Sequence, residues 1–333
     1  RPLIKNLNEL PYLDFEDFDF NKYAPPGHLK NCLLLETSRG CIFNCVFCGQ
    51  RTYWQGFRTM SGKRIYEEIK FQVEKYPNFE QIEFLDLVFN GNMRTLKEFC
   101  DLMISMPIKK NLRWHANMVV RPDMTEEICR KMKQAGCWHL TFGIESGSQK
   151  VLDKMKKNFS IIDAEEVIRN THNSGIMVTC NFMFGFPGET EEDFQQTLDF
   201  IKRNAKYIDM LYPSYTYFTI EPFSYLASHL DEFGVIPNPV HGQYWDSVDL
   251  KNTYPERLKR YEKFISLANS LGTKIGSGLQ TSIEQEKYYK LGIYYESKKD
   301  YEQAINCFKK YLELDPNNIV ILNKIKIIKN IES

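Results

Sequence analysis

Short apolar runs rich in β-branched and aromatic residues alternate with longer stretches of helical periodicity from Cys32 to about Phe218. This alternation is typical of repeated βα units on a parallel sheet. The runs that we predict as strands are residues 32–37, 81–87, 112–118, 139–144, 177–184 and 210–218. Six strands are too few for a closed eight-stranded barrel. We therefore predict an α/β fold, a partial (βα)6 TIM-like parallel barrel.

The C-terminal part of the chain follows a different pattern. Residues 285–318 resemble one tetratricopeptide repeat, a pair of helices, through the spacing of Tyr288, Leu291, Gly292, Tyr295, Ala304, Phe308 and Pro316. A single repeat cannot bury its apolar faces alone. We therefore predict a C-terminal all-α extension that packs against its own chain, and we keep a protein partner as the alternative.

Composition and charge exclude several classes of protein. The 43 basic and 43 acidic residues cancel, and no long run has one sign, so we expect neither nucleic-acid nor anionic-membrane binding. No stretch approaches the roughly 18 apolar residues of a membrane helix, and the first residues lack the apolar core of a signal peptide. The nine cysteines, an odd number, suit reduced thiols. We expect a cytoplasmic protein.

Three cysteines stand close together directly after the first predicted strand, in a C-x-x-x-C-x-x-C spacing: Cys41, Cys45 and Cys48. Parallel barrels bind ligands where their strands end. Three thiolates can hold three corners of a 4Fe-4S cluster and leave the fourth iron open. Structural zinc with a distant fourth ligand, such as His28 or Cys32, is the alternative. Zinc sites usually contain paired C-x-x-C units, however, and this chain has no second pair.

This cysteine spacing, with the aromatic Phe47 before the third cysteine, resembles the signature of the radical S-adenosylmethionine (SAM) superfamily. The resemblance implies that SAM binds the open iron, that all three cysteines are catalytic and metal-binding, and that Phe47 is one of the cofactor-binding residues. An electron from the cluster then breaks a carbon-sulfur bond of SAM, and the resulting 5'-deoxyadenosyl radical abstracts hydrogen from a substrate. The resemblance also implies a reducing partner such as flavodoxin or ferredoxin.

A second motif, Gly-Ile-Glu-Ser-Gly, ends the fourth predicted strand. It resembles the motif by which relatives bind the ribose and the amino-acid end of SAM. We therefore expect Gly143, Glu145 and Ser146 to bind the cofactor, because glycine allows close approach and the two side chains can form hydrogen bonds. A capped turn, in which Ser146 or Ser148 starts the next helix, is the structural alternative.

Three further polar residues lie on predicted strands. Asp86 stands where relatives carry a polar turn that meets the methionyl amino group, although Leu85 and Leu87 depart from the relatives' pattern. Asn181 becomes a candidate cofactor contact if its strand face points inward, and a structural hydrogen bond is the alternative. His115 is a candidate acid or base, but a lone histidine in a strand is more often structural.

The opening segment and residues 53–61 resemble cobalamin-binding radical SAM enzymes. In such enzymes a linker joins an N-terminal cobalamin domain to the barrel. We therefore expect a cobalamin domain outside these residues, and methyl transfer to an unknown substrate. The alternatives are a radical SAM enzyme that does not methylate and lacks cobalamin, and a zinc-stabilised tetratricopeptide interaction protein. The expected segments are a linker (1–30), the catalytic barrel (31–222), a helical elaboration (223–283) and tetratricopeptide-like helices (284–333).

Overall fold

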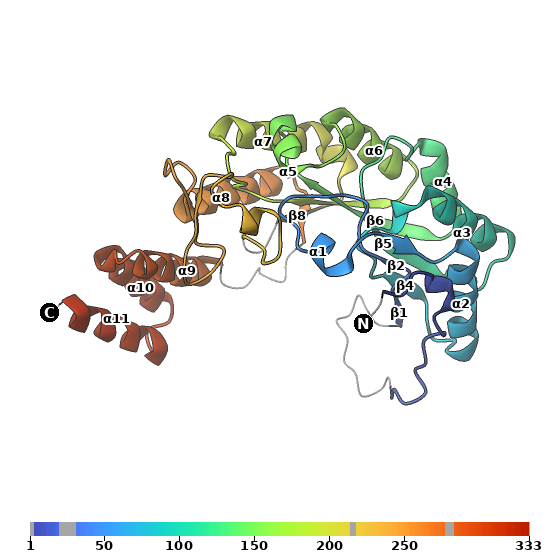
Figure 1. The fold of residues 1–333 in the computed structure, drawn as a ribbon, viewed down its shortest axis with the longest axis horizontal. Helices are drawn as coiled ribbons and strands as arrows, with labels where there is room; N and C mark the ends of the chain where they lie inside the picture. The colour runs from blue at the N-terminus through green and yellow to red at the C-terminus, as the bar shows by residue number, and fades with distance from the viewer. Residues whose placement is uncertain (1–2, 20–30, 214–217, 277–282, 333) are drawn as a thin grey trace.

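A parallel seven-stranded sheet forms the centre of the computed structural model, which describes residues 3–19, 31–213, 218–276 and 283–332 (Figure 1). Its strand order is β1-β4-β5-β6-β7-β8-β11. The strands are β1 (Cys32–Leu35), β4 (Gln81–Phe84), β5 (Arg113–Met118), β6 (Cys137–Glu145), β7 (Met177–Phe182), β8 (Met210–Pro213) and β11 (Lys274–Ile275). Every pair of neighbours is parallel. Because β1 and β11 are the two edges of the described sheet, it is an open, partial barrel.

The predicted strands are confirmed in order and direction, with different bounds. The last of them ends at Pro213, and residues 214–217 lie outside the described residues. The seventh strand, β11, was not predicted. It has two residues and pairs with β8 through Lys274 and Met210. The segment predicted as a helical elaboration therefore also contributes a strand to the sheet.

The helices and the shorter elements connect these strands. The helices are α1 (Gln50–Trp54), α2 (Gly62–Lys75), α3 (Met93–Ser105), α4 (Glu126–Gln134), α5 (Gln149–Met155), α6 (Ile161–Asn173), α7 (Glu191–Asn204) and α8 (Tyr254–Ser270). The short strands β2 (Ser38–Arg39) and β3 (Arg58–Thr59) pair antiparallel, as do β9 (Val235–Ile236) and β10 (Asp246–Ser247). Single 3-10 turns lie at Leu7–Glu9, Phe89–Gly91, Ala205–Tyr207 and Leu226–Ser228.

The main core lies between the sheet and its outer helices. Alternation along β5 places Trp114 and Ala116 in that core, whereas His115 and Asn117 occupy the opposite, inner face. Four aromatic rings from β4, the following turn, α3 and β5 pack together there: Phe84, Phe89, Phe99 and Trp114. Outer helices such as α2 and α7 begin at side-chain caps, Ser61 and Thr190. This arrangement leaves the inner face free for polar side chains.

The N-terminal segment runs along α2. Glu68, which is 1% exposed, accepts the backbone N–H of Leu13 at 2.9 Å and pairs with Arg64 at 2.7 Å. Arg64 also donates to the carbonyl of Leu10, and Gln72 donates to the carbonyl of Leu13. The segment that was predicted as a linker is thus bound to the barrel by side chains of one helix.

Three helices end the chain: α9 (Ile283–Ser297), α10 (Tyr301–Leu314) and α11 (Ile319–Glu332). They share a small core that includes Phe308 and Ile321. A Cβ at Gly292 would lie 2.4 Å from the Phe308 ring, so α9 and α10 pack very closely. On the other side of α9, Tyr294 donates to Asp246 at 3.0 Å. The predicted helix pair is confirmed, and it contacts its own chain.

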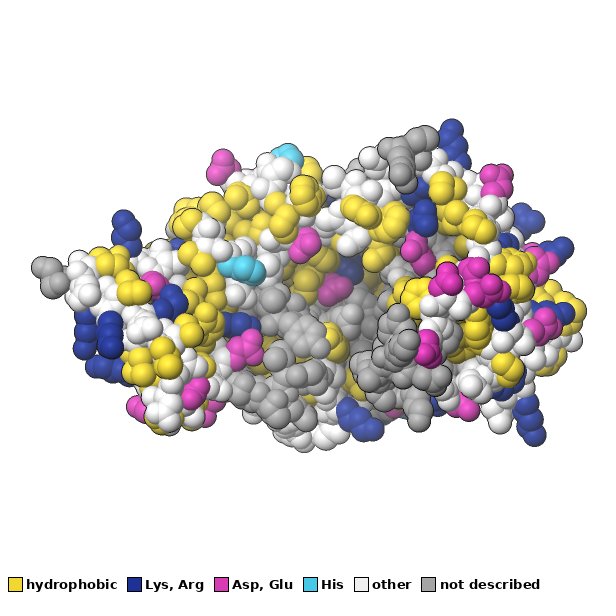
Figure 2. All heavy atoms as spheres, turned by 90° about the horizontal axis from the view of Figure 1, so that it is seen from below, with side chains coloured by type: hydrophobic (Ala, Val, Ile, Leu, Met, Phe, Trp, Pro, Cys, Tyr) yellow, Lys and Arg dark blue, Asp and Glu magenta, His cyan; other side chains and the backbone are white. Residues whose placement is uncertain are grey.

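The outer surface of these helices carries hydrophobic side chains next to basic ones (Figure 2). The exposed apolar residues of α11 are Ile319, Val320, Leu322, Ile327 and Ile331. Within the described part of the chain, no helix is long and apolar enough to cross a membrane.

Candidate functional site

The cysteine loop follows β1 at the carboxyl end of the sheet, as predicted, and its three thiols are partly exposed. Two backbone hydrogen bonds hold its centre: Val46 donates to the carbonyl of Met155 at 3.1 Å, and its own carbonyl accepts from Leu226 at 2.9 Å. The N–H of Cys48 donates to the carbonyl of Cys45 at 3.2 Å. The loop is therefore fixed from α5 on one side and from residues after β8 on the other.

The three thiols influence one another electrostatically. Burial raises the pKa of Cys45 to about 11, and the neighbouring Cys41 and Cys48 add to this shift. Burial also raises the pKa values of Cys41 and Cys48. The ammonium group of Lys157 acts in the opposite direction on all three thiols. Each of the three thiols is therefore within electrostatic reach of the Lys157 ammonium.

This donor set suits a cluster of several irons. Among residues 3–19, 31–213, 218–276 and 283–332, no three His, Cys, Asp or Glu side chains are grouped around a single metal-ion position. A 4Fe-4S cube does not need such convergence, because each thiolate binds a different iron. Cys41, Cys45 and Cys48 are the residues that would hold it.

Glu145 and Lys157 form a buried ion pair beside the thiols. The Lys157 Nζ lies 3.1 Å from Glu145 Oε1 and donates to the carbonyl of Gly143 at 2.9 Å. The side chain of Lys157 is 7% exposed, and that of Glu145 is 13% exposed. Burial lowers the pKa of Lys157, but Glu145 and Cys45 outweigh burial and leave that pKa raised. The lysine therefore carries its charge at neutral pH.

The backbone of Glu145 is unusual. Its φ is +69°, in the left-handed region that a non-glycine residue adopts at an energetic cost. The register between β6 and β7 also shifts between Gly143 and Glu145. A Cβ at Gly143 would lie 2.4 Å from Glu145 Oε1 and 3.3 Å from Lys157 Nζ. Glycine is thus needed at 143 to leave room for the ion pair, and the strained end of β6 directs Glu145 to the thiols.

Phe47 also lies in this group. Its ring centre is 5.8 Å from Lys157 Nζ and 6.4 Å from the ring centre of Phe218. The structure thus brings together the three cysteines, Phe47, Gly143 and Glu145 from the sequence prediction. Sequence reasoning missed Lys157, because lysine is usually a solvated surface residue and no motif marks it.

Ser146 and Asp86 face other parts of the protein. Ser146 is fully buried, and its hydroxyl lies 3.2 Å from the Thr197 hydroxyl on α7. Asp86 is 1% exposed, and its Oδ1 accepts the N–H of Thr37 at 3.2 Å and the Thr37 hydroxyl at 3.0 Å. Burial raises the pKa of Asp86 to about 6. Both residues support the segments around the site in this structure, and their direct contact with a cofactor stays a prediction.

The inner face of the sheet carries the remaining polar candidates. Asn181 is partly exposed and lies in register with Gly143 on β6. His115 is held on both sides: its Nδ1 is 2.6 Å from Glu83, and its Nε2 is 2.9 Å from the Thr141 hydroxyl. His115 is thus hydrogen-bonded as a structural histidine would be, and the contact of Asn181 with a cofactor stays a prediction.

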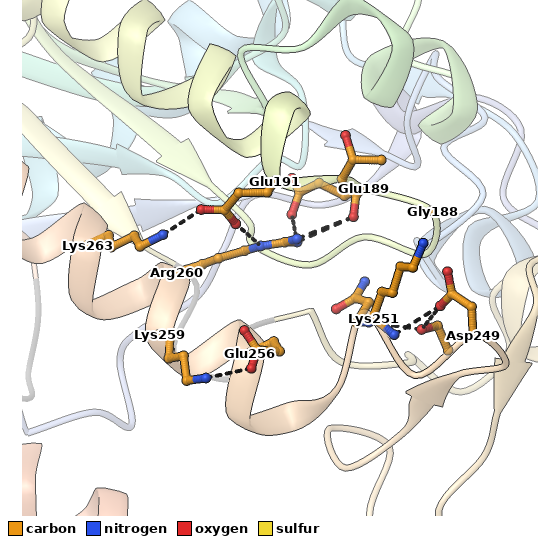
Figure 3. A pocket seen from close by; sticks show the side chains of 12 residues that line it. Gly188, Glu189, Glu191, Asp249, Lys251, Glu256, Lys259, Arg260 and Lys263 are labelled. Carbon is orange, nitrogen blue, oxygen red and sulfur yellow. Dashed lines mark hydrogen bonds and ion pairs between the residues drawn. The ribbon is translucent and has the colours of Figure 1, made fainter.

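A separate cavity of about 530 Å³ lies between the turn that follows β7 and helix α8 (Figure 3). Several of its charged side chains form ion pairs. Arg260 contacts Glu189 at 2.8 Å and Glu191 at 3.4 Å, and Lys259 contacts Glu256 at 2.6 Å. None of the three clustered cysteines lines this cavity. We therefore assign the ion pairs of Arg260 a structural role in joining α8 to the turn.

Comparisons with known proteins show what this chain is similar to. A model of the Tetratricopeptide repeat matches residues 286–318. An uncharacterized methyltransferase of Pyrococcus horikoshii is 30% identical over 249 residues, covering 74% of this chain and 50% of the relative. An anaerobic magnesium-protoporphyrin IX monomethyl ester cyclase of Cereibacter sphaeroides is 29% identical over 164 residues, covering 48% and 26%. The chain thus spans half or less of these curated relatives.

Among solved structures, the radical S-adenosylmethionine methyltransferase TsrM from Kitasatospora setae, with cobalamin and a 4Fe-4S cluster bound, has a TM-score of 0.59. It shares 13% sequence identity, and the match covers 84% of this chain and 61% of TsrM, so the likeness concerns the fold. The model of the Radical SAM superfamily matches residues 35–201, about half of the chain, including the cysteine loop and the strands β2 to β7. The protein belongs to the radical SAM superfamily.

Proposed function

We propose that this chain is the catalytic part of a radical SAM methyltransferase. In this proposal the three cysteines hold a 4Fe-4S cluster, and the neighbouring polar residues bind SAM. When bound, the reduced cluster supplies the electron that splits a carbon-sulfur bond of SAM. The single observation that carries the proposal is the buried Glu145–Lys157 pair next to the three thiols, because it gives the site both a cation and a carboxylate.

Each residue has a proposed task. Lys157 balances the negative charge of the thiolates, since its ammonium already lowers the pKa of each thiol. Glu145 has a second carboxylate oxygen that can accept a hydrogen bond from the ribose or the ammonium of SAM. Phe47 covers the cofactor next to Cys48. Asn181 contributes an amide from the inner face. We propose these contacts for the bound state.

Methyl transfer is the proposed reaction because the relative from Pyrococcus horikoshii is described as a methyltransferase and TsrM shares the fold. Cobalamin would then be bound by residues outside this chain. A second candidate is a radical reaction without methylation, which the cyclase relative from Cereibacter sphaeroides supports. The reducing partner, the substrate, a protein partner of the tetratricopeptide unit and the cytoplasmic location stay predictions.

The cluster assignment is tested with Cys45→Ala and a matched control, Cys32→Ala. Cys32 is also partly exposed, and it is the described candidate for the fourth ligand in the zinc alternative. After anaerobic reconstitution with iron and sulfide, we expect the wild type and Cys32→Ala to bind four irons and to form 5'-deoxyadenosine from SAM with dithionite. Cys45→Ala should do neither, while its circular dichroism stays that of the wild type.

Two results would contradict the assignment: 5'-deoxyadenosine formation by Cys45→Ala, or a colourless wild type that binds zinc and needs Cys32. The reaction class is tested separately. SAM with a deuterated methyl group is incubated with dithionite, hydroxocobalamin and a longer chain that includes the residues proposed to bind cobalamin, and mass spectrometry follows the label. Label in methylcobalamin supports methyl transfer, whereas 5'-deoxyadenosine without labelled methylcobalamin supports the second candidate.

A further inference from the structure

We infer that Arg257 on α8 is a positioning residue for the cofactor site. Through Trp245 it fixes the hydrophobic surface on which Val46 and Phe47 of the cysteine loop rest. This inference rests on the proposed function, and it extends the site beyond residues 35–201, which match the family model.

The cysteine loop rests on a small hydrophobic cluster that is separate from the main core. We call it the loop platform. Its members other than Val46 are buried to at least 96% and come from α5 and from the residues after β7 and β8: Val151, Met155, Phe186, Phe218, Leu226, Val235 and Trp245. Val46 is buried in this cluster, and Phe47 packs at its edge. The geometry of the loop therefore depends on the loop platform.

Trp245 holds Phe218, the platform residue that touches Phe47. The Trp245 Nε1–H donates to the carbonyl of Phe218 at 2.9 Å, and the two rings meet edge to face at 6.0 Å. The backbone N–H of Phe218 donates to the carbonyl of Phe184 at 3.0 Å. Phe218 then meets Phe47 edge to face at 6.4 Å. A displacement of Trp245 would therefore move Phe218, and through Phe218 it would move Phe47, the neighbour of Cys48.

Arg257 lies directly against Trp245. It is fully buried, and its guanidinium carbon is 4.1 Å from the centre of the indole. Its Nη2 donates to the carbonyl of Trp245 at 2.7 Å and to that of Gln243 at 2.9 Å. Burial lowers the pKa of Arg257 to about 9, so it remains charged at neutral pH. The cation is thus held by backbone carbonyls and one aromatic face.

The same arginine also fixes a second member of the loop platform. The turn after β7 passes Arg257 so closely that a Cβ on Gly185 would lie 2.2 Å from its aliphatic carbons. Asn252 joins them: its side-chain oxygen accepts from Arg257 at 3.3 Å, and its Nδ2 donates to the carbonyls of Gly185 and Phe186 at 3.1 and 3.2 Å. Arg257 therefore positions both Trp245 and Phe186.

A buried cation without a carboxylate within ion-pair distance is costly for a protein to retain. Among the described residues no ion pair of Arg257 is found, and the nearby Asp246 is already paired with Lys298 at 2.5 Å. The contacts of Arg257 instead converge on the segments that form the loop platform. A purely structural arginine would affect folding alone, whereas a positioning residue would also change the binding of SAM.

The test compares Arg257→Met with Arg64→Met in the complete chain. Arg64 is a matched control: it is also buried, lies 4.1 Å from the ring of Tyr12, and bonds a backbone carbonyl, but on α2. SAM is titrated into the reduced, reconstituted proteins, and its effect on the cluster's electron paramagnetic resonance signal is followed. For Arg257→Met we expect wild-type iron content and an about tenfold higher SAM concentration at half effect.

Arg64→Met should lose stability but keep the wild-type SAM midpoint. A midpoint of Arg257→Met equal to that of Arg64→Met would overturn the inference, even if the protein melts earlier. If Arg257→Met does not fold, Trp245→Phe decides alone. This variant keeps one aromatic ring but removes the N–H that binds Phe218 together with part of the indole that faces Arg257, and an unchanged midpoint would again overturn the inference. A wild type without a SAM-sensitive cluster would instead refute the proposed function.

Discussion

Replacing Lys157 by methionine should destabilise the protein strongly, because it leaves the Glu145 carboxylate buried without its cation. The change removes an ion pair of 3.1 Å and a hydrogen bond of 2.9 Å to the carbonyl of Gly143. Removal of one partner of a buried pair typically costs about 3–5 kcal/mol. Glu145 retains 13% of its exposure, so water screens it partly and the lower end, about 3 kcal/mol, is expected.

The assay is thermal and urea unfolding of the anaerobic protein without iron. A loss of about 3 kcal/mol corresponds to a melting temperature about 6–12 °C lower for a domain of roughly 200 residues. The variants Glu145→Gln and Glu145→Gln/Lys157→Met complete a double-mutant cycle. Because the double variant buries no lone charge, it should be more stable than the sum of the single changes predicts, by about 2 kcal/mol. Additivity of the two changes, within about 0.5 kcal/mol, would refute the reasoning.

Three further predictions concern other parts of the molecule. The folded-state pKa of Asp86 is raised from 3.8 to about 6. Protonation of Asp86 thus stabilises the folded state fully below about pH 4, and this stabilisation is lost by about pH 6.5. In urea titrations over that range, the unfolding free energy of the wild type should fall by about 1–3 kcal/mol relative to that of Asp86→Asn. In Gly292→Ala, hydrogen exchange should show the C-terminal helices opening before the rest of the protein, because the added Cβ would lie 2.4 Å from the Phe308 ring. Cluster assembly should be unchanged. Thr190→Ala removes the capping box with Asp193 and should lower the urea-unfolding free energy by about 1 kcal/mol without changing SAM cleavage.

Much of the fold was predictable because its signals are local. The alternation of buried and exposed side chains along β5 and the periodic row of apolar side chains on α2 each arise within about a dozen residues. Patterns of this kind identified the strands in their correct order. The strand β11 could not be predicted in this way. Two residues, Lys274 and Ile275, contain no periodic pattern, and they become a strand because β8 offers an open edge.

The candidate site could be predicted where the proposed chemistry depends on spacing along the chain. The three cysteines are such a case, and their position at the end of β1 follows from the rule for parallel strands. The roles of Ser146 and Asp86 were harder to predict. Ser146 could face the site or α7, and Asp86 could face the site or Thr37. The packing of distant segments decides between these directions, and the alternation of side chains along a strand does not describe that packing.

The chain itself determined a parallel sheet, a loop with three thiols at its carboxyl edge, and a helix pair at its end, because neighbouring residues encode all three. Only the tertiary structure placed Lys157 against Glu145 and the thiols, and Arg257 beneath the loop platform. The loop platform joins segments that lie up to about 200 positions apart along the chain, such as those of Val46 and Trp245. Which charged side chains meet depends on which of these distant segments are buried together.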